Sequence, residues 1–299
     1  MKDKLCIGVV NFQAVWGNIP ENLERIRKFC GQAKDLGAQM VVFPETALTG
    51  YSILEQGAMH RAAAQEIPGE ASRAILRMAK DMGLYLAVGM PEREAGKIYN
   101  SVLAVSPGGI GAVYRKIHPF GRELLWCAKG QAPAIWETPW GKVGIGICYD
   151  TYQFPELIRY YAARGCRLYL NCTAQAGQAD TPQAAERFRQ YYFSTIEAAA
   201  LSNEIFLASS NLCGQEKGTH FGGGSLVIGP VPRTAGWEED PYCKVYAGGL
   251  ENRQVGIAVA EIDLCLAVRT IYQNNSLAGE PDYRPHLYRS WLEEKEEKF

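Results

Sequence analysis

Short apolar runs of strand type alternate with helical segments in the first half of the chain, and this alternation restricts the possible folds more than any other feature. The strand-like runs lie at residues 5–12, 39–44 and 84–90. Between them, apolar residues recur at helical spacing over residues 23–36 and 71–82, and Gly37 and Gly83 act as stop signals. This order predicts βα units in a layered α/β fold.

A second kind of connection appears beyond residue 98, where strands follow one another through turn-rich segments such as S-P-G-G and T-P-W-G-K. The expected strands are 98–105, 112–117, 135–138, 143–147, 168–171, 205–209, 225–228 and 255–262, and the expected helices are 155–163 and 182–202. Together, βα units and hairpins indicate a mixed sheet covered by helices. No linker or repeat divides the chain, which predicts a single domain over residues 1–299 with a polar tail from about residue 264.

The composition argues against several classes of function. With 31 basic and 32 acidic residues, the net charge of −1 leaves no basic footprint for nucleic acid. No stretch approaches the ~20 apolar residues of a membrane span, and residues 5–10 are too short for the apolar core of a signal peptide. The nine cysteines are odd in number and lack C-x-x-C spacing, as in reduced intracellular proteins. We therefore expect a cytoplasmic protein that binds neither nucleic acid nor membrane.

Three reactive side chains lie at or just beyond the ends of apolar runs. They are Glu45, Lys116 and Cys148. Strand ends of an α/β sheet bring such groups to one rim, where a carboxylate, an amine and a thiol supply a base, a cation and a nucleophile. Cys148 follows G-I-G-I and precedes a helical stretch, which predicts a strand–turn–helix corner like the elbow of a hydrolase nucleophile. Glu123 lies within reach of the Lys116 loop.

Other interpretations of these residues stay open. Cys148 can be a buried core cysteine, and Lys116 a solvated charge at a strand edge. A dyad of Cys148 with His118 or His220 is conceivable. No His has metal-ligand spacing with another His or with Cys, so no metal site is expected. The run F-G-G-G-S at residues 221–225 predicts a close backbone approach at the start of a strand.

Taken together, these segments resemble the carbon-nitrogen hydrolase (nitrilase) superfamily over nearly the whole chain. The family places a Glu in F-P-E before L-T-G-Y, as at residues 43–51, and a Lys in Y-R-K-x-H-x-F, as at residues 114–120. Its nucleophile stands in G-x-x-I-C-Y-D, as at residues 144–150. Weaker similarities are F-G-G-G-S and the segment Y-R-P-H-L-Y at residues 283–288.

The resemblance implies an α/β fold of four layers, an α-β-β-α sandwich with mixed sheets, which forms a homodimer or larger homo-oligomer. It assigns Cys148 as the nucleophile and Glu45 as the general base. Lys116, with the amide of Tyr149, would stabilise the oxyanion and help lower the pKa of the thiol, and Glu123 would orient Lys116 or the hydrolytic water. No cofactor is implied.

The resemblance also bears on the substrate. The pair Tyr149-Asp150 after the nucleophile is typical of the amidase and carbamoylase branch, and favours a small amide or N-carbamoyl substrate over a nitrile. This chain departs from the family by a third residue between C-Y-D and F-P-E, by Pro119, and by N-C-T-A at residues 171–174, all where substrate contacts are expected. The candidate substrate-binding residues are Tyr51, Tyr152, Asn171 and Thr173, and Tyr191 and Tyr192 are further candidates for the pocket wall.

Three alternatives remain at this point. The same thioester can serve nitrile hydrolysis or acyl transfer to an amine, and a non-catalytic binding protein can keep the pocket alone. The tail from about residue 264 is a candidate dimer contact, and its charge run at residues 293–298 is expected to be a solvated helix end.

Overall fold

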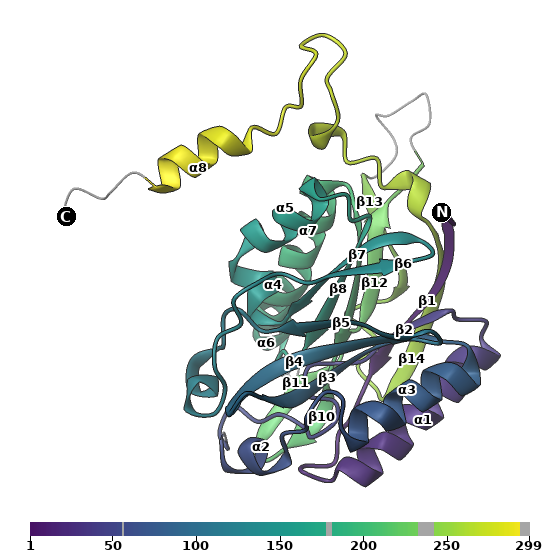
Figure 1. Cartoon of the computed structure of the whole chain (residues 1–299), viewed down its shortest axis with the longest axis vertical. Coiled ribbons are helices and arrows are strands. Elements are labelled where there is room, and N and C mark those ends of the chain that lie inside the picture. The colour runs from purple at the N-terminus through teal and green to yellow at the C-terminus, as the bar shows by residue number, and fades with distance from the viewer. Residues whose placement is uncertain (56, 178–180, 233–241, 294–299) are drawn as a thin grey trace, which may run out of the picture.

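Two six-stranded sheets pack face to face, and helices cover the outer face of each (Figure 1). The computed structural model describes residues 1–55, 57–177, 181–232 and 242–293. The layers run helix, sheet, sheet, helix, as expected for the α-β-β-α sandwich. The helices are α1 (Ile19–Asp35), α2 (Ala58–Ala63), α3 (Glu70–Met82), α4 (Tyr149–Gln153), α5 (Pro155–Ala163), α6 (Pro182–Phe188), α7 (Ser194–Asn203) and α8 (Pro285–Glu293).

The first sheet has the order β14-β1-β2-β3-β4-β5, and its parallel strands are the ones connected through helices. Its strands are β14 (Gly256–Asp263), β1 (Lys4–Asn11), β2 (Met40–Val42), β3 (Tyr85–Glu94), β4 (Lys97–Ser106) and β5 (Gly109–Arg115). The pairs β1–β2 and β2–β3 are parallel, whereas β1–β14, β3–β4 and β4–β5 are antiparallel. The predicted mixed sheet is therefore confirmed.

The second sheet repeats this plan, with the order β13-β12-β9-β8-β7-β6. Its strands are β13 (Cys243–Gly248), β12 (Leu226–Pro230), β9 (Phe206–Asn211), β8 (Leu168–Thr173), β7 (Gly141–Ile147) and β6 (Ile135–Thr138). The inner strands β7, β8 and β9 are parallel. A separate hairpin joins β10 (Cys213–Glu216) to β11 (Thr219–Gly222).

Alternation along the strands decides which residues meet. Ile7 and Val9 of β1 join Ile145 and Ile147 of β7 in the core between the sheets. The neighbouring Val10 belongs to the other core, with residues of α1 and α3 such as Ile26. Because successive side chains of a strand point to opposite faces, a strand buried on both sides is apolar throughout. This explains the continuous apolar runs in the sequence.

Helix ends follow the sequence signals. Asn18 accepts a hydrogen bond from the amide of Glu21 at 3.2 Å and caps α1. Gly37 and Gly83, at φ of +79° and +72°, terminate α1 and α3 in the left-handed region as predicted. The close backbone approach at F-G-G-G-S is also confirmed, because a Cβ on Gly223 would press on the backbone of Arg253.

Some predicted elements differ in detail. The expected long helix 182–202 consists of α6 and α7 joined by a π-helical turn, η2 (Arg189–Phe193). The helix predicted at 155–163 is present as α5, but the short helix α4, which begins directly after Cys148, was not predicted. The helix α2, the hairpin β10–β11 and strand β13 were not predicted, because each is short and lacks a clear apolar period.

The C-terminal segment leaves the body of the molecule, and α8 lies apart from both sheets with no buried residue (Figure 1). Apart from Glu293 at the end of α8, the predicted charged helix end lies outside the described residues. Among the helices that the structure describes, none is long and apolar enough to cross a membrane.

Candidate active site

Cys148 occupies a strained turn between β7 and α4. Its φ of +49° places a non-glycine residue in the left-handed region, which costs roughly 1–2 kcal/mol. Two contacts to β8 hold the turn, because the amide of Cys148 donates to the carbonyl of Cys172 at 3.1 Å and to Oδ1 of Asn171 at 3.2 Å. The predicted strand–turn–helix corner is present, and it leaves the thiol half-buried.

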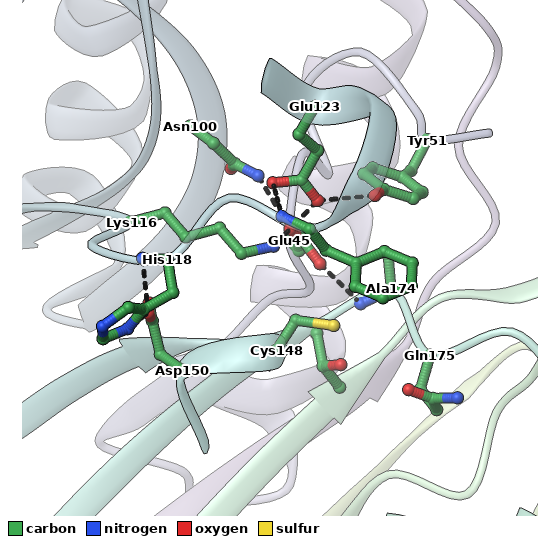
Figure 2. A network of polar contacts seen from close by, with 12 residues as sticks. Glu45, Tyr51, Asn100, Lys116, His118, Glu123, Cys148, Asp150, Ala174 and Gln175 are labelled. Atoms are coloured by element: carbon green, nitrogen blue, oxygen red, sulfur yellow. Dashed lines mark hydrogen bonds and ion pairs between the residues drawn. The ribbon is translucent and has the colours of Figure 1, made fainter. Parts of the chain in front are cut away.

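Lys116, at the end of β5, lies between two carboxylates (Figure 2). Its ammonium nitrogen Nζ is 2.7 Å from Oε1 of Glu45 and 2.8 Å from Oε1 of Glu123, and all three side chains are fully buried. Glu45 follows β2, and Glu123 belongs to the short 3₁₀ helix η1 (Gly121–Leu125). The structure thus brings Glu45, Lys116 and Glu123 together in one enclosed cluster, beside Cys148 from the other sheet.

The charges of this cluster act on one another. Burial raises the pKa of Glu45 to about 7, although the adjacent Lys116 favours the charged carboxylate. Burial alone would lower the pKa of Lys116, but the carboxylates of Glu123 and Glu45 outweigh it and hold that pKa well above its ordinary value. Glu45 is therefore poised to gain and lose a proton near neutral pH, while Lys116 stays charged.

The pKa of Cys148 is raised by burial and by the Glu45 carboxylate, while Lys116 and the Thr173 hydroxyl offset only part of this. Lys116 does favour the thiolate, as expected. The pKa of Cys148 nevertheless lies above its ordinary value, because burial and Glu45 together outweigh Lys116. Burial dominates because the thiolate loses its hydration. A thiol in this setting needs a base, and Glu45 is the adjacent one.

The predicted substrate-binding residues are joined to one another by hydrogen bonds. Asn171 uses both ends of its amide, accepting from Thr151 and the Cys148 amide and donating to Tyr152 and Ser209. The Tyr152 hydroxyl donates to Thr173 at 2.8 Å. Asn171, Tyr152 and Thr173 thus form a buried hydrogen-bonded network, which Asn171 connects to the Cys148 turn.

Tyr51 lies on the opposite side of the cluster, and its hydroxyl donates to Oε1 of Glu123 at 2.5 Å. Tyr192 is buried against Ser209, whereas Tyr191 is half-buried and its hydroxyl accepts from Gln153 at 3.3 Å. Of the candidate tyrosines, Tyr191 is the one that keeps exposed surface. Burial is the main cause of its raised pKa, and the nearby Cys148 adds to the shift.

Asp150 links the Lys116 loop to the nucleophile turn. Its buried carboxylate accepts from the amide of His118 at 2.9 Å, contacts Nδ1 of His118 at 2.8 Å, and accepts from the Tyr114 hydroxyl at 2.7 Å. His118 also stacks on Phe154, with ring centroids 3.4 Å apart. His118 is therefore engaged by Asp150, and its contacts place it beside the loop and not in a dyad with Cys148.

Three sets of contacts within the candidate site were not predicted from the sequence. Asn100 donates from Nδ2 to Oε1 of Glu45 at 2.7 Å, and the amide of Ala174 donates to Oε2 at 3.0 Å. The third is the contact of Asp150 with Tyr114 and His118, because the sequence marked Asp150 only as part of the Tyr149-Asp150 pair. A signal existed for Asn100, since it is a polar residue inside an apolar strand. Nothing in the sequence marks a main-chain amide such as that of Ala174.

Among the described residues, no three His, Cys, Asp or Glu side chains are grouped so as to hold a metal ion. The groups that are present suit a different chemistry. A thiol, an adjacent base and a buried cation can form and resolve an acyl adduct.

Comparison with known proteins places this geometry in context. A family model described as carbon-nitrogen hydrolase matches residues 6–270. A nitrilase of Pyrococcus abyssi is 30% identical over 248 residues, covering 82% of this chain and 85% of the relative. An omega-amidase of Xenopus tropicalis is 32% identical over 234 residues, covering 73% and 80%.

Solved structures agree. A mutant of the amidase from Nesterenkonia sp. AN1, with the acetamide moiety of fluoroacetamide added covalently at its active-site cysteine, has a TM-score of 0.72 and 26% identity, covering 97% of both chains. A second mutant of that amidase, in complex with acrylamide, has a TM-score of 0.71 and 26% identity, covering 96% of this chain and 97% of the other.

Proposed function

This chain belongs to the carbon-nitrogen hydrolase family, whose members act on C–N bonds other than peptide bonds, and we propose that it cleaves a small amide or N-carbamoyl compound through a thioester on Cys148. The observation that carries the proposal is the buried cluster beside the thiol. Nζ of Lys116 lies 2.7 Å from Oε1 of Glu45, and burial raises the pKa of Glu45 to about 7. A base with this pKa can take a thiol proton and return it at neutral pH.

In the first step, Glu45 accepts the proton of Cys148 while the sulfur attacks the carbonyl carbon. Lys116 has three N–H donors, of which two are used by Glu45 and Glu123. The third N–H and the amide of Tyr149 stabilise the oxyanion. Tyr149 suits this role because it is the first residue of α4, where backbone N–H groups lack an intrahelical acceptor.

In the second step, the tetrahedral intermediate collapses. The C–N bond breaks, Glu45 gives its proton to the leaving nitrogen, and ammonia or an amine departs. Water then loses a proton to Glu45 and attacks the thioester, which releases the acid and restores the thiol. Glu123 orients Lys116 through both steps, because it also holds the Tyr51 hydroxyl and the amide of Phe120.

The substrate is an amide in preference to a nitrile. Three features support this: the Tyr149-Asp150 pair, the omega-amidase relative and the amidase structures. Ammonia release from aliphatic amides, ω-amides, N-carbamoyl amino acids and nitriles tests the class directly. A clear preference for the nitrile over its matched amide would contradict it.

The same assay tests the mechanism through variants. Cys148→Ala should abolish release, whereas Cys166→Ala, at a buried cysteine of the core, should retain it. Intact mass spectrometry should find the acyl adduct on Cys148. Release that survives in Cys148→Ala removes the proposal, and an amine acceptor that diverts the product would indicate acyl transfer.

We further infer a single domain in a cytoplasmic homodimer that binds neither nucleic acid nor membrane. The C-terminal segment supports the dimer, because Leu277, Trp291 and Leu292 are 97%, 59% and 79% exposed. A second copy of the chain would cover this apolar surface. Sedimentation at several concentrations, comparing the full chain with one ending at residue 276, tests it.

A further inference from the structure

Asn100 contacts both Glu45 and Lys116, the two residues proposed to act with Cys148. It lies in β4, is fully buried, and donates from Nδ2 to Oε1 of Glu45 at 2.7 Å (Figure 2). Its main-chain carbonyl accepts the amide of Lys116 at 2.8 Å. One residue thus holds the carboxylate by its side chain and the lysine by its backbone.

The two oxygens of Glu45 are unequally occupied. Oε1 accepts from both Lys116 Nζ and Asn100 Nδ2, each at 2.7 Å, whereas Oε2 accepts, within the described part of the chain, a single bond from the amide of Ala174 at 3.0 Å. A carboxylate oxygen has two lone pairs, so Oε2 keeps one free and Oε1 does not. Figure 2 shows the Cys148 sulfur pointing toward this side of the carboxylate and the Ala174 nitrogen.

We propose that Asn100 is a positioning residue that, by occupying Oε1 together with Lys116, makes Oε2 of Glu45 the oxygen that exchanges the proton with Cys148. The proposal rests on the function given above. In the step concerned, the S–H bond breaks, an O–H bond forms at Oε2, and the sulfur keeps the electron pair. The proton is then returned from Oε2 to the leaving nitrogen.

Lys116 cannot fix the carboxylate in this way by itself. Its ammonium is a compact charge on a flexible stem with rotatable donors, and it serves either oxygen equally well. The amide of Asn100 is planar and directional. Its Oδ1 is buried and has no hydrogen-bond partner among the residues that the structure describes. If the Asn100 amide were turned over, its Oδ1 would face Oε1 of Glu45, and two acceptors would repel each other. Ionised Glu45 therefore fixes one orientation of the Asn100 amide. The hydrogen bond gained in that orientation offsets the cost of leaving Oδ1 unpaired.

The test removes the donor while keeping the shape of the residue. Asn100→Leu keeps the branch at Cγ and the number of side-chain heavy atoms, and Asn100→Ala truncates the side chain; both lose the N–H directed at Glu45. Asn203→Leu is the matched control, because Asn203 is also buried and hydrogen-bonded but lies at the end of α7. The rate of Cys148 alkylation by iodoacetamide is measured from pH 5 to 9 with no amide substrate, and mass spectrometry locates the adduct.

Alkylation requires that Glu45 has taken the thiol proton, so its rate follows the ionised fraction of Glu45. Loss of the hydrogen bond from Asn100 to the Glu45 carboxylate should raise the pKa of Glu45 and move the acid limb to higher pH by about one unit. At a pH below the limb, the alkylation rate should then be about tenfold lower. Both Asn100 variants should show the shift, and Asn203→Leu should not. With the best amide, kcat/KM should shift in the same way while KM stays unchanged.

Each other outcome has a meaning. An unchanged limb in both Asn100 variants, or failure of both to fold while Asn203→Leu folds, overturns the proposal. A shifted limb without turnover of any amide upholds the role of Asn100 and contradicts the proposed hydrolysis. Alkylation of wild type away from Cys148 contradicts the mechanism on which both depend.

Discussion

The main-chain amide of Ala174 donates a 3.0 Å hydrogen bond to Oε2 of Glu45, and this bond joins the ends of two strands from different sheets (Figure 2). Glu45 follows β2 of the first sheet, whereas Ala174 follows β8 of the second. The candidate base is therefore held from both layers of the sandwich. Its position depends on how the sheets pack, not on either sheet alone.

Replacement of Lys116 by Met should lower kcat by roughly 10²–10³, because the oxyanion loses a preorganised donor. The change also leaves Glu45 and Glu123 facing each other without a cation, and breaking such a buried pair costs about 3–5 kcal/mol of stability. Lys142→Met, at an exposed lysine, is the control and should change neither quantity. Turnover and thermal midpoint are measured on the same preparations. A folded Lys116→Met enzyme with normal kcat would contradict the assigned role.

The pH dependence of kcat/KM should show an acid limb near pH 7. Burial raises the pKa of Glu45 to about 7, so below that pH the carboxyl holds a proton and cannot accept one from Cys148. Activity therefore rises as pH increases through about 7. Glu45→Gln should abolish this activity at every pH, since the amide cannot act as a base. A limb near pH 4, typical of an exposed Glu, would contradict the raised pKa of Glu45 and show that this carboxylate is fully ionised at neutral pH.

His60 should make the protein sensitive to acid. It is buried between Trp16 and Trp126, and burial lowers its pKa to about 4 from 6.5. Below pH 6.5 the unfolded chain takes up a proton that folded His60 does not bind until about pH 4. This histidine therefore costs stability as pH falls through that window, by up to about 3 kcal/mol.

Chemical denaturation of His60→Phe at several pH values isolates this effect, because the difference from wild type removes the contributions of other groups. The loss of unfolding free energy between pH 6.5 and 4 should be smaller in His60→Phe. His286→Phe, at an exposed histidine, should follow wild type. Parallel curves for His60→Phe and wild type would mean that His60 titrates normally.

Gly50→Ala should damage the loop that carries Tyr51. Gly50 has φ +85°, and an added Cβ would overlap the Glu216 carboxylate, which accepts the amides of Tyr51 and Ala14 at 2.8 and 3.3 Å. Gly37→Ala is the matched control, with φ +79° and open space around its Cβ.

Both glycine variants should lose about 1–2 kcal/mol to the strained φ. Gly50→Ala should lose about 1–3 kcal/mol more, because the amide of Tyr51 gives up its acceptor, and its kcat should fall as the Tyr51 hydroxyl leaves Glu123. Urea unfolding and turnover of the two variants are compared. Equal losses in both would show that the Glu216 contact contributes nothing.

Much of the architecture was accessible from the sequence. Short continuous apolar runs and helices ended by Gly37 and Gly83 are local signals, so the βα order and the mixed sheets were predicted correctly. The pairing of two sheets into four layers came from the resemblance to a family. Local pattern cannot reveal it, because a strand buried on both faces reads the same whichever layer covers it.

The candidate site divides in the same way. Glu45, Lys116 and Cys148 were predicted because unusual side chains follow apolar strands, and the structure brings them close together. The environment of Cys148 was not predictable, since its raised pKa arises from burial and from a carboxylate about 100 residues distant in sequence. Asn100 is marked as a polar residue within a largely apolar strand, but its contact with Glu45, 55 residues away in sequence, could not be predicted from that pattern.

The division of the site between the sheets has a consequence for how the protein loses its activity. The candidate base Glu45 and the cation Lys116 belong to the first sheet, and the candidate nucleophile Cys148 belongs to the second. A small separation of the layers would part the thiol from Glu45 while leaving every strand hydrogen-bonded within its own sheet. Catalysis is thus a more sensitive gauge of inter-sheet cohesion than far-ultraviolet circular dichroism, and it should vanish first as denaturant loosens the sandwich.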